Sequence, residues 1–164
     1  MQEFTQKYTI VTLLEDVKEG YEYPSDGWPL HITIADTFAI KWDVNELIKK
    51  LAELSTNILP VNSVALYDEN FGPEQQTQVT ILDMNEALAN LHYKVICVLK
   101  DAEIIFNNPQ YVESGFRAHV TAQPNARINK DDTITIDNLA IVDMFPNGDP
   151  YRRKIIKIMK LQGS

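Results

Sequence analysis

The sequence is poor in cysteine and has no long apolar run. Its 164 residues include a single cysteine, Cys97, which excludes an intrachain disulfide and favours a reducing compartment. No apolar stretch approaches the length that spans a bilayer, and residues 1–7 lack the basic and then apolar pattern of a signal peptide. We therefore expect a cytoplasmic protein that does not cross a membrane.

Basic residues are scarce as well. The 15 Lys and Arg residues are outnumbered by 23 Asp and Glu, which gives a net charge of −8 and an isoelectric point near 4.8. An acidic surface repels long polyanions, so tight binding to duplex DNA is disfavoured. A small phosphorylated ligand in a locally positive cleft is still compatible with this charge. Apolar residues make up 45% of the chain, enough for one domain or for two small lobes that share a core.

The periodicity of the apolar residues predicts strands and two helices. Short apolar or β-branched stretches predict strands at 8–14, 30–35, 64–67, 76–82, 116–122, 133–144 and 153–161, of which 64–67 with 76–82 and the last two form hairpins. Helical spacing begins after Asp43 and again at Asp83, and a glutamate follows each aspartate in the spacing of a capping box. The segments 15–29, 106–115 and 123–132 are rich in turn residues and are expected to be loops.

Two of the three histidines lie in the same short pattern. Each copy reads histidine, aliphatic residue, threonine and then a small or aliphatic residue: His31-Ile32-Thr33-Ile34 and His119-Val120-Thr121-Ala122. Alternate side chains of a strand point to the same face, so each histidine should lie beside its threonine while the aliphatic residue points to the other face. An imidazole and a hydroxyl, brought together twice, indicate a chemical role.

The third histidine and the cysteine have a simpler interpretation. His92 lies beside the apolar stripe of the second predicted helix, one turn after Leu88. We expect a helix histidine that borders the core. Cys97, on the same helix, is expected to fill space as a small apolar residue.

The two halves of the chain resemble one another. Residues 59–68 are similar to residues 134–143, and each segment is followed by a turn with Phe, Pro and Gly and then by another predicted strand, 76–82 or 153–161. A histidine–threonine strand precedes each segment. A duplication of this kind would bring the two histidine–threonine pairs face to face near a pseudo-two-fold axis.

Two facing histidine–threonine pairs suit the cleavage of a phosphodiester or a cyclic phosphate. One neutral imidazole takes a proton from the nucleophile, one imidazolium gives a proton to the leaving oxygen, and an ordinary pKa near 6.5 makes both forms accessible. The threonine hydroxyls would donate hydrogen bonds to the phosphate oxygens. A metal site is a weaker alternative, because neither a carboxylate nor a cysteine recurs in both motifs. A serine hydrolase is disfavoured because the sequence has no G-x-S-x-G.

The paired motifs resemble those of the two-histidine (2H) phosphoesterase superfamily, which includes 2′-5′ RNA ligase-like proteins and 2′,3′-cyclic phosphodiesterases. Phe116-Arg117 also resembles the F-R-x-H form that is common around the second histidine. The order of the predicted elements is compatible with this family over nearly the whole chain. Departures are Ala118, where the family usually has proline, Ala122, where a larger aliphatic residue is usual, and the loop 15–29, where many members have a helix.

The resemblance implies an α+β fold in which 1–164 form one domain of two pseudo-symmetric lobes, with antiparallel sheets and flanking helices around a central cleft. It also implies that His31 and His119 act as acid and base, that Thr33 and Thr121 bind the phosphate, and that no metal or other cofactor is needed. Arg117 would then support the positive potential of the cleft.

Further ligand contacts are expected from aromatic and basic residues outside the motifs: Tyr23 and Trp28 in the loop 15–29, and Tyr151 and Arg153 in the last hairpin. The alternative for the two aromatics of the loop is that they cover the edge of a core, and the alternative for Tyr151 and Arg153 is a solvated turn. The sequence thus predicts a monomeric phosphoesterase that acts on a small nucleotide or short oligonucleotide with a cyclic or 2′-5′ phosphate. Two alternatives are a binding module without catalytic activity that kept the cleft, and an enzyme that processes or ligates RNA ends.

Overall fold

The computed structural model describes residues 6–41 and 43–163. Its strands are β1 (Lys7–Leu13), β2 (Glu22–Pro24), β3 (His31–Ala39), β4 (Val61–Phe71), β5 (Thr77–Leu82), β6 (Ile105–Phe106), β7 (His119–Thr121), β8 (Thr133–Ile136), β9 (Asn138–Asp143) and β10 (Arg152–Lys160). The α-helices are α1 (Val44–Ser55) and α2 (Glu86–Asp101). Three short 3₁₀ helices are η1 (Pro109–Tyr111), η2 (Glu113–Gly115) and η3 (Pro146–Gly148).

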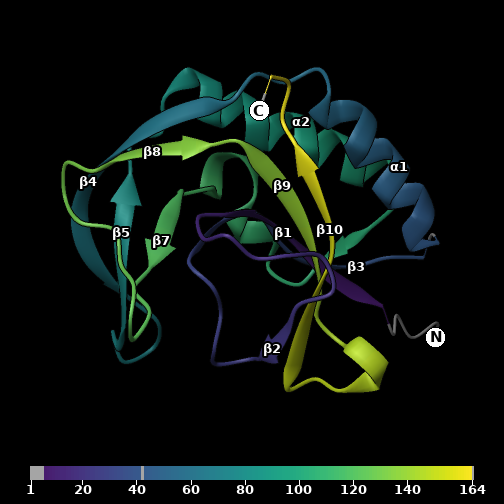
Figure 1. Cartoon of the computed structure of the whole chain (residues 1–164), viewed down its shortest axis with the longest axis horizontal. Coiled ribbons are helices and arrows are strands. Elements are labelled where there is room, and N and C mark those ends of the chain that lie inside the picture. The colour runs from purple at the N-terminus through teal and green to yellow at the C-terminus, as the bar shows by residue number, and fades with distance from the viewer. Residues whose placement is uncertain (1–5, 42, 164) are drawn as a thin grey trace.

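The strands form one antiparallel sheet with β3 and β7 side by side in its middle. The strand order is β2-β10-β9-β1-β3-β7-β5-β4-β8, and β6 pairs with the far end of β3. Figure 1 shows β4, β5, β7 and β8 on the left of the molecule and β1, β9, β10 and β2 on the right. The α+β class predicted from the sequence is confirmed. Where one sheet per lobe was expected, the direct pairing of β3 with β7 makes a single sheet.

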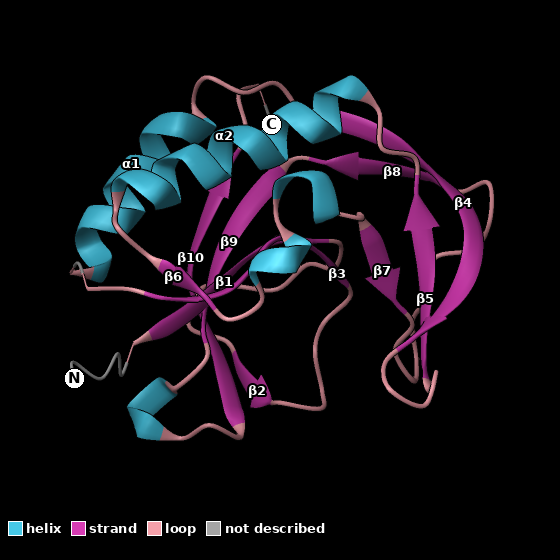
Figure 2. Cartoon of the chain, turned by 180° about the vertical axis from the view of Figure 1, so that it is seen from behind, coloured by secondary structure: helices cyan, strands magenta, loops and turns pink. Residues whose placement is uncertain are grey.

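Both helices cover the same face of the sheet. α1 and α2 pack against each other, and Figure 2 shows them side by side across the upper part of the sheet. The main core lies beneath them and includes Ile32, Ile34 and Val120, each at most 1% exposed, together with Leu47 of α1 and Leu91 of α2. The aliphatic residues of the two motifs therefore anchor β3 and β7 in the core, as the alternation predicted.

A second, smaller core lies on the opposite face of the sheet. It contains Val11, Leu13, Tyr23, Ala140, Val142 and Ile155, with Trp28 packed against it. Val11 and Leu13 alternate along β1 with residues of the main core. In the antiparallel ladder Val11 pairs with Thr33, and Leu13 pairs with His31. The histidine–threonine face is thus the face turned away from the helices, next to this second core.

The first helix begins where the capping signal predicted, and the second begins later. The side chain of Asp43 caps α1 by accepting a hydrogen bond from the N–H of Asn45 at 2.8 Å. The cap of α2 is Asn85, which accepts the N–H of Leu88 at 2.9 Å, and not the predicted Asp83. Asp83 is held against β4 instead. Its N–H donates to the carbonyl of Val64 at 2.9 Å, and its carbonyl accepts the hydroxyl of Ser63 at 2.8 Å. The carbonyl of a cap residue accepts the first hydrogen bond of the helix, and at Asp83 the side chain of Ser63 takes that place.

Two further elements differ from the sequence prediction. The predicted loop 15–29 contains β2, which pairs with β10 through its register partners Tyr23 and Arg153. The predicted strand 133–144 is broken at Asp137 into β8, which pairs with β4, and β9, which pairs with β1 and β10. None of the helices in the described part of the chain is long and apolar enough to cross a membrane.

Candidate active site

The two histidine–threonine motifs lie on neighbouring antiparallel strands. Ile32 of β3 pairs with Val120 of β7. Antiparallel register then sets His31 beside Thr121 and Thr33 beside His119 on the face away from the helices. All four side chains are half-buried, whereas the two aliphatic partners are buried. The motifs are therefore related by a local two-fold axis that passes between Ile32 and Val120.

Both histidines are held by the same backbone bond. Nδ1 of His31 lies 2.8 Å from the carbonyl oxygen of Pro29, and Nδ1 of His119 lies 2.8 Å from the carbonyl oxygen of Arg117. A carbonyl only accepts hydrogen bonds, so Nδ1 is the nitrogen that carries the proton in each ring. Nε2 is then the nitrogen of each histidine that is available for proton exchange.

An aromatic ring packs against each histidine. The ring centroid of Trp28 lies 4.6 Å from that of His31, and the ring of Phe71, at the end of β4, lies edge-on to His119 with centroids 4.9 Å apart. Trp28 was predicted as a ligand contact, and the structure places it beside a motif histidine. Phe71 was not predicted, because nothing in its local sequence distinguishes it from an ordinary residue of a hairpin turn.

The surroundings lower the pKa of both histidines. Burial lowers the pKa of His31, the bond to Pro29 opposes this, and the like charge of His119 lowers it further. Burial also lowers the pKa of His119. The bond to the backbone carbonyl of Arg117 opposes this, the charge of the Arg117 guanidinium lowers the pKa further, and the carboxylates of Asp36 and Glu69 oppose it. Both imidazoles are therefore biased towards the neutral form, and the second has acidic neighbours that favour its charged form.

A cavity of about 650 Å³ opens beside β7 on this face of the sheet. Thr33 and His119 line it, so one residue of each motif reaches it. Its other walls come from β3, the end of β4 and the segment between β6 and β7: Asp36, Glu69, Asn70, Phe71, Gly72, Gln75, Asn108, Gln110, Tyr111, Gly115, Phe116 and Arg117. This volume lies within the usual range for small-molecule sites, roughly 300–1,000 Å³.

Arg117, one of the predicted ligand contacts, lines the cavity. Its guanidinium donates to Glu69 at 2.9 Å and lies over the ring of Phe71, 5.4 Å from the centroid. Half of this side chain is exposed. Among the described residues that line the cavity, Arg117 is the single Lys or Arg.

Three of the predicted ligand contacts lie elsewhere. Tyr23 is 1% exposed in the second core, and burial strongly raises its pKa, so its ring is not available to a ligand. Tyr151 is 76% exposed at the turn between β9 and β10. Arg153 donates through Nη1 to the carbonyls of Met144 at 3.1 Å and Pro150 at 2.8 Å and so holds this turn together. The structure does not bring these residues to the motif histidines.

His92 is buried at the border of the core, as expected, and both of its ring nitrogens take part in hydrogen bonds. It is 3% exposed, its Nδ1 lies 2.7 Å from the carbonyl of Ile34, and its Nε2 accepts the N–H of Glu113 at 2.9 Å. Its ring stacks on Phe116 with centroids 3.8 Å apart. His92 thus joins β3 to the segment that forms one wall of the cavity.

No group of three or more histidine, cysteine, aspartate or glutamate side chains is placed to hold a metal ion within the described ranges 6–41 and 43–163.

Comparison with solved structures identifies the fold. A structure described as a phosphoesterase superposes with a TM-score of 0.54 at 14% identity and covers 96% of this chain and 98% of its own. Escherichia coli LigT in complex with 3′-AMP gives 0.56 at 14% identity, with 95% and 98% covered. The protein TT0787 of Thermus thermophilus gives 0.57 at 15% identity, with 96% and 99% covered.

The chain has the LigT-like phosphoesterase fold. The match extends over nearly the full length of both chains, so the resemblance that the paired motifs indicated is confirmed for the fold. No protein-family model and no curated protein sequence matches the chain. The identities are low enough that the likeness carries the fold alone, and the residues of the site stand on their own geometry.

Proposed function

We propose that this chain is a metal-independent phosphoesterase that cleaves a cyclic phosphate or a 2′-5′ phosphodiester in a small nucleotide or short oligonucleotide. The observation that carries the proposal is the Ile32–Val120 register, which sets each motif histidine beside the threonine of the other motif. The LigT-like fold supports a phosphoesterase. The Escherichia coli LigT structures with 3′-AMP, with NADP⁺ and with phosphate support a nucleotide as the ligand class.

The proposed reaction is a displacement at phosphorus with the phosphate held between β3 and β7. The neutral histidine takes a proton from the attacking water at Nε2, a new P–O bond forms, and the bond to the leaving oxygen breaks. The protonated histidine gives its Nε2 proton to that oxygen, so the total charge of the histidine pair is unchanged. The hydroxyls of Thr33 and Thr121 donate to the non-bridging oxygens as charge builds on them.

The environments of the histidines favour one assignment of acid and base for hydrolysis. At His119 the charge of Arg117 is opposed by its ion-pair partner Glu69, and Asp36 further favours the charged form, so we assign His119 as the acid that protonates the leaving oxygen. The charged neighbour that acts on His31 is His119 itself, which disfavours a second positive charge. His31 is therefore the base, and its contact with Trp28 fixes its ring.

We also infer that the domain is a duplication of two lobes that meet at β3 and β7. The sheet order supports this, because β1 and then β9 follow β3 on one side while β5 and then β4 follow β7 on the other. β9 and β4 are the strands whose sequences resemble one another. The strands that follow them in the chain, β5 and β10, do not hold equivalent places in the sheet. β5 lies between β7 and β4, whereas β10 lies on the side of β9 that faces away from β1 and β3.

The direct test is turnover of 2′,3′-cyclic nucleotides by the purified protein, with and without excess chelator. We expect turnover that is retained in chelator and is lost in His31→Ala and His119→Ala. Ligand binding without turnover in the wild type would instead support the non-catalytic binding module. Turnover that disappears in chelator and returns with a divalent ion would contradict the metal-independent mechanism.

A further inference from the structure

The cavity beside β7 has an unusual balance of charge for a site that receives a phosphorylated ligand. Two carboxylates, Asp36 and Glu69, line it. The single Lys or Arg of its described lining, Arg117, is already paired with Glu69, and the other cationic group, His119, acts at the reacting phosphate. A second phosphate placed here would meet an acidic wall. The part of the ligand that fills this cavity is therefore uncharged and presents hydrogen-bond donors, while the one reacting phosphate lies at the histidines.

Asp36 reaches the cavity because β3 departs from regular strand geometry. The nine residues of β3 pair with the seven of β1, and the register shifts on both sides of Ile10. Strict alternation from Thr33 would turn Ala35 towards the cavity and Asp36 towards the helices. Ala35 instead lies in the core under the helices, and Asp36 lines the cavity with Thr33. Bulges next to active sites commonly redirect one side chain in this way.

The Asp36 carboxylate is fixed in place and keeps acceptor capacity. Its Oδ2 accepts a hydrogen bond from Nδ2 of Asn108 at 3.1 Å. A carboxylate accepts about four hydrogen bonds, so with respect to the described residues 6–41 and 43–163 most of its acceptor positions are open to a ligand. The rings of Phe71, Tyr111 and Phe116 line the same cavity and offer flat apolar surfaces on which a base can stack.

We propose that Asp36, oriented by Asn108, selects substrates whose base carries an exocyclic amino group, namely adenine, cytosine or guanine, over uracil. The amino group donates to the carboxylate as the cytosine amine does in base readout. Uracil has one N–H between two carbonyl oxygens, and those oxygens repel a carboxylate. This selection rests on the proposed phosphoesterase function and names the substrate class of that site.

The experiment compares kcat/KM for the 2′,3′-cyclic phosphates of adenosine, cytidine, guanosine and uridine. The wild type should favour the amino bases over uridine by roughly tenfold or more, as expected for a hydrogen bond to a charged group. Asp36→Asn should bring this ratio close to one, because an amide pairs with either kind of base edge. The fold should be kept, since Asn108 can donate to an amide oxygen as it does to the carboxylate.

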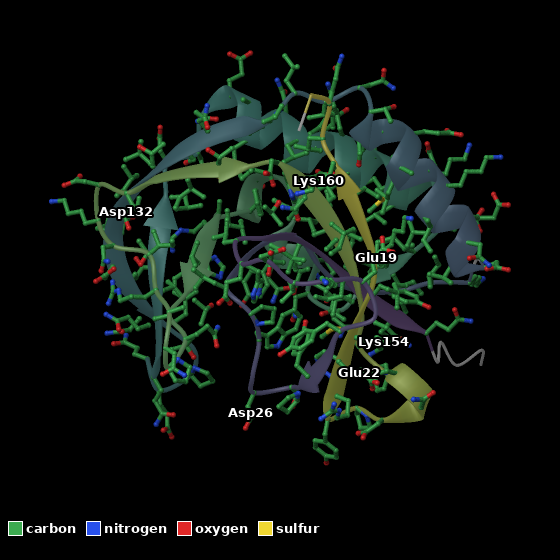
Figure 3. The ribbon with its side chains drawn as sticks, in the orientation of Figure 1. Glu19, Glu22, Asp26, Asp132, Lys154 and Lys160 are labelled. Carbon is green, nitrogen blue, oxygen red and sulfur yellow. The ribbon has the colours of Figure 1, made fainter. Side chains whose placement is uncertain are left out.

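The ratio of kcat/KM for the amino bases to kcat/KM for uridine separates selection of the base from two other roles that Asp36 could have. A purely electrostatic effect on His119, or a structural role, would scale all four substrates together and leave the ratio unchanged. The matched control is Asp26→Asn, which removes a charge from the loop after β2; Figure 3 shows this side chain pointing away from the sheet. It should change neither the ratio nor the rates.

Three outcomes decide the question. A wild-type ratio near one, or a ratio that Asp36→Asn does not move, overturns the selection by Asp36 and leaves the phosphoesterase function standing. Turnover of none of the four substrates overturns the cleavage of 2′,3′-cyclic phosphates as the function. In that case the affinities for adenosine and uridine 3′-monophosphate test the cavity directly. A tighter adenosine complex that depends on Asp36 supports the inference, and equal affinities overturn it.

Discussion

Nε2 of His92 accepts the backbone N–H of Glu113 at 2.9 Å and so ties α2 to the wall of the ligand cavity. The bond matters because Glu113 has a φ of 56°, in the left-handed region that a non-glycine residue adopts only when its surroundings hold it there. The same imidazole reaches the carbonyl of Ile34, directly after Thr33, at 2.7 Å. One buried side chain therefore supports both a motif strand and the cavity wall.

We predict that His92→Phe destabilises the protein and weakens ligand binding more than it slows catalysis. Phenylalanine keeps the stacking on Phe116 but leaves the buried carbonyl of Ile34 and the part-buried N–H of Glu113 without this partner. A buried group left unsatisfied costs about 1–3 kcal/mol, and a part-buried group costs less. Urea unfolding and the separation of kcat from KM measure the two effects. The matched control is Lys100→Gln, which breaks the exposed ion pair with Glu113 and leaves the backbone bond intact. An unchanged KM in His92→Phe would show that His92 is structural only.

The free energy of unfolding should fall as the pH drops below about 6.5. Burial is the largest cause of the lowered pKa of His31, His92 and His119. The unfolded chain therefore binds protons at a pH where the folded chain does not, and stability is lost on acidification through this window. Chemical denaturation between pH 5 and pH 8 measures the slope. His92→Phe should have a shallower slope than the wild type, and an equal slope would contradict the contribution of His92.

We predict that His31→Ala and His119→Ala each lower turnover by roughly 10²–10⁴-fold, because each removes a general acid or base. Thr33→Val and Thr121→Val should lose less, since each removes one hydrogen bond to the phosphate and keeps the shape of the side chain. Single-turnover rates on a 2′,3′-cyclic nucleotide measure the losses. Thr135→Val on the edge strand β8 is the matched control and should keep full activity. Wild-type activity in one of the histidine variants would show that this histidine has no part in the mechanism.

The pH dependence of kcat/KM should be bell-shaped with its maximum below pH 6.5. This profile reports the free enzyme, in which both catalytic histidines have a lowered pKa. Below the lower pKa the base is protonated, and above the higher pKa the acid has lost its proton. A bound phosphate stabilises an imidazolium, so the maximum of kcat should lie at a higher pH than that of kcat/KM. A kcat/KM maximum well above pH 7 would contradict the environments described for the two histidines.

The sequence predicted which side chains of the two motif strands share a face, but not how the two strands pair. Period-two alternation was enough to place His31 with Thr33 and His119 with Thr121, because the buried Ile32 and Val120 fix which face each strand turns to the core. The register between β3 and β7 was not predictable, since the motifs lie far apart in the chain and only the folded sheet aligns them.

The side chains that complete the site depend on tertiary structure. Asp36 reaches the cavity only through the irregular pairing of β3, and Phe71 reaches His119 only because β4 extends beyond the predicted strand. The sequence of the loop 15–29 allowed Tyr23 either to contact a ligand or to cover the edge of a core, and the pairing of β2 with β10 turns it into the second core. In each case the local sequence allows the side chain to lie at the site or away from it, and the pairing of its strand in the folded sheet decides between the two.

The last prediction concerns the size of the substrate. Proteins that bind long RNA rely on many Lys and Arg contacts to phosphates, and their affinity falls steeply as salt rises. The basic residues of the last hairpin are on β10, which β9 and β1 separate from β3. Figure 3 shows Lys154 and Lys160 on this strand, and Lys157 lies 3.6 Å from Glu19. Little positive charge is left for the motif face, where Arg117 lines the cavity.

We therefore expect the enzyme to prefer a mono-, di- or short cyclic nucleotide over a folded RNA. The measurement is a competition, in moderate salt, between a short 2′,3′-cyclic nucleotide and a structured RNA that ends in the same cyclic phosphate. The short substrate should be cleaved with the higher kcat/KM, and its rate should depend weakly on salt, because few phosphate contacts release few counterions. A clear preference for the structured RNA, with a steep salt dependence, would show that surfaces beyond the cavity bind substrate. The two-histidine mechanism would stand in that case, since it depends only on the phosphate that lies between β3 and β7.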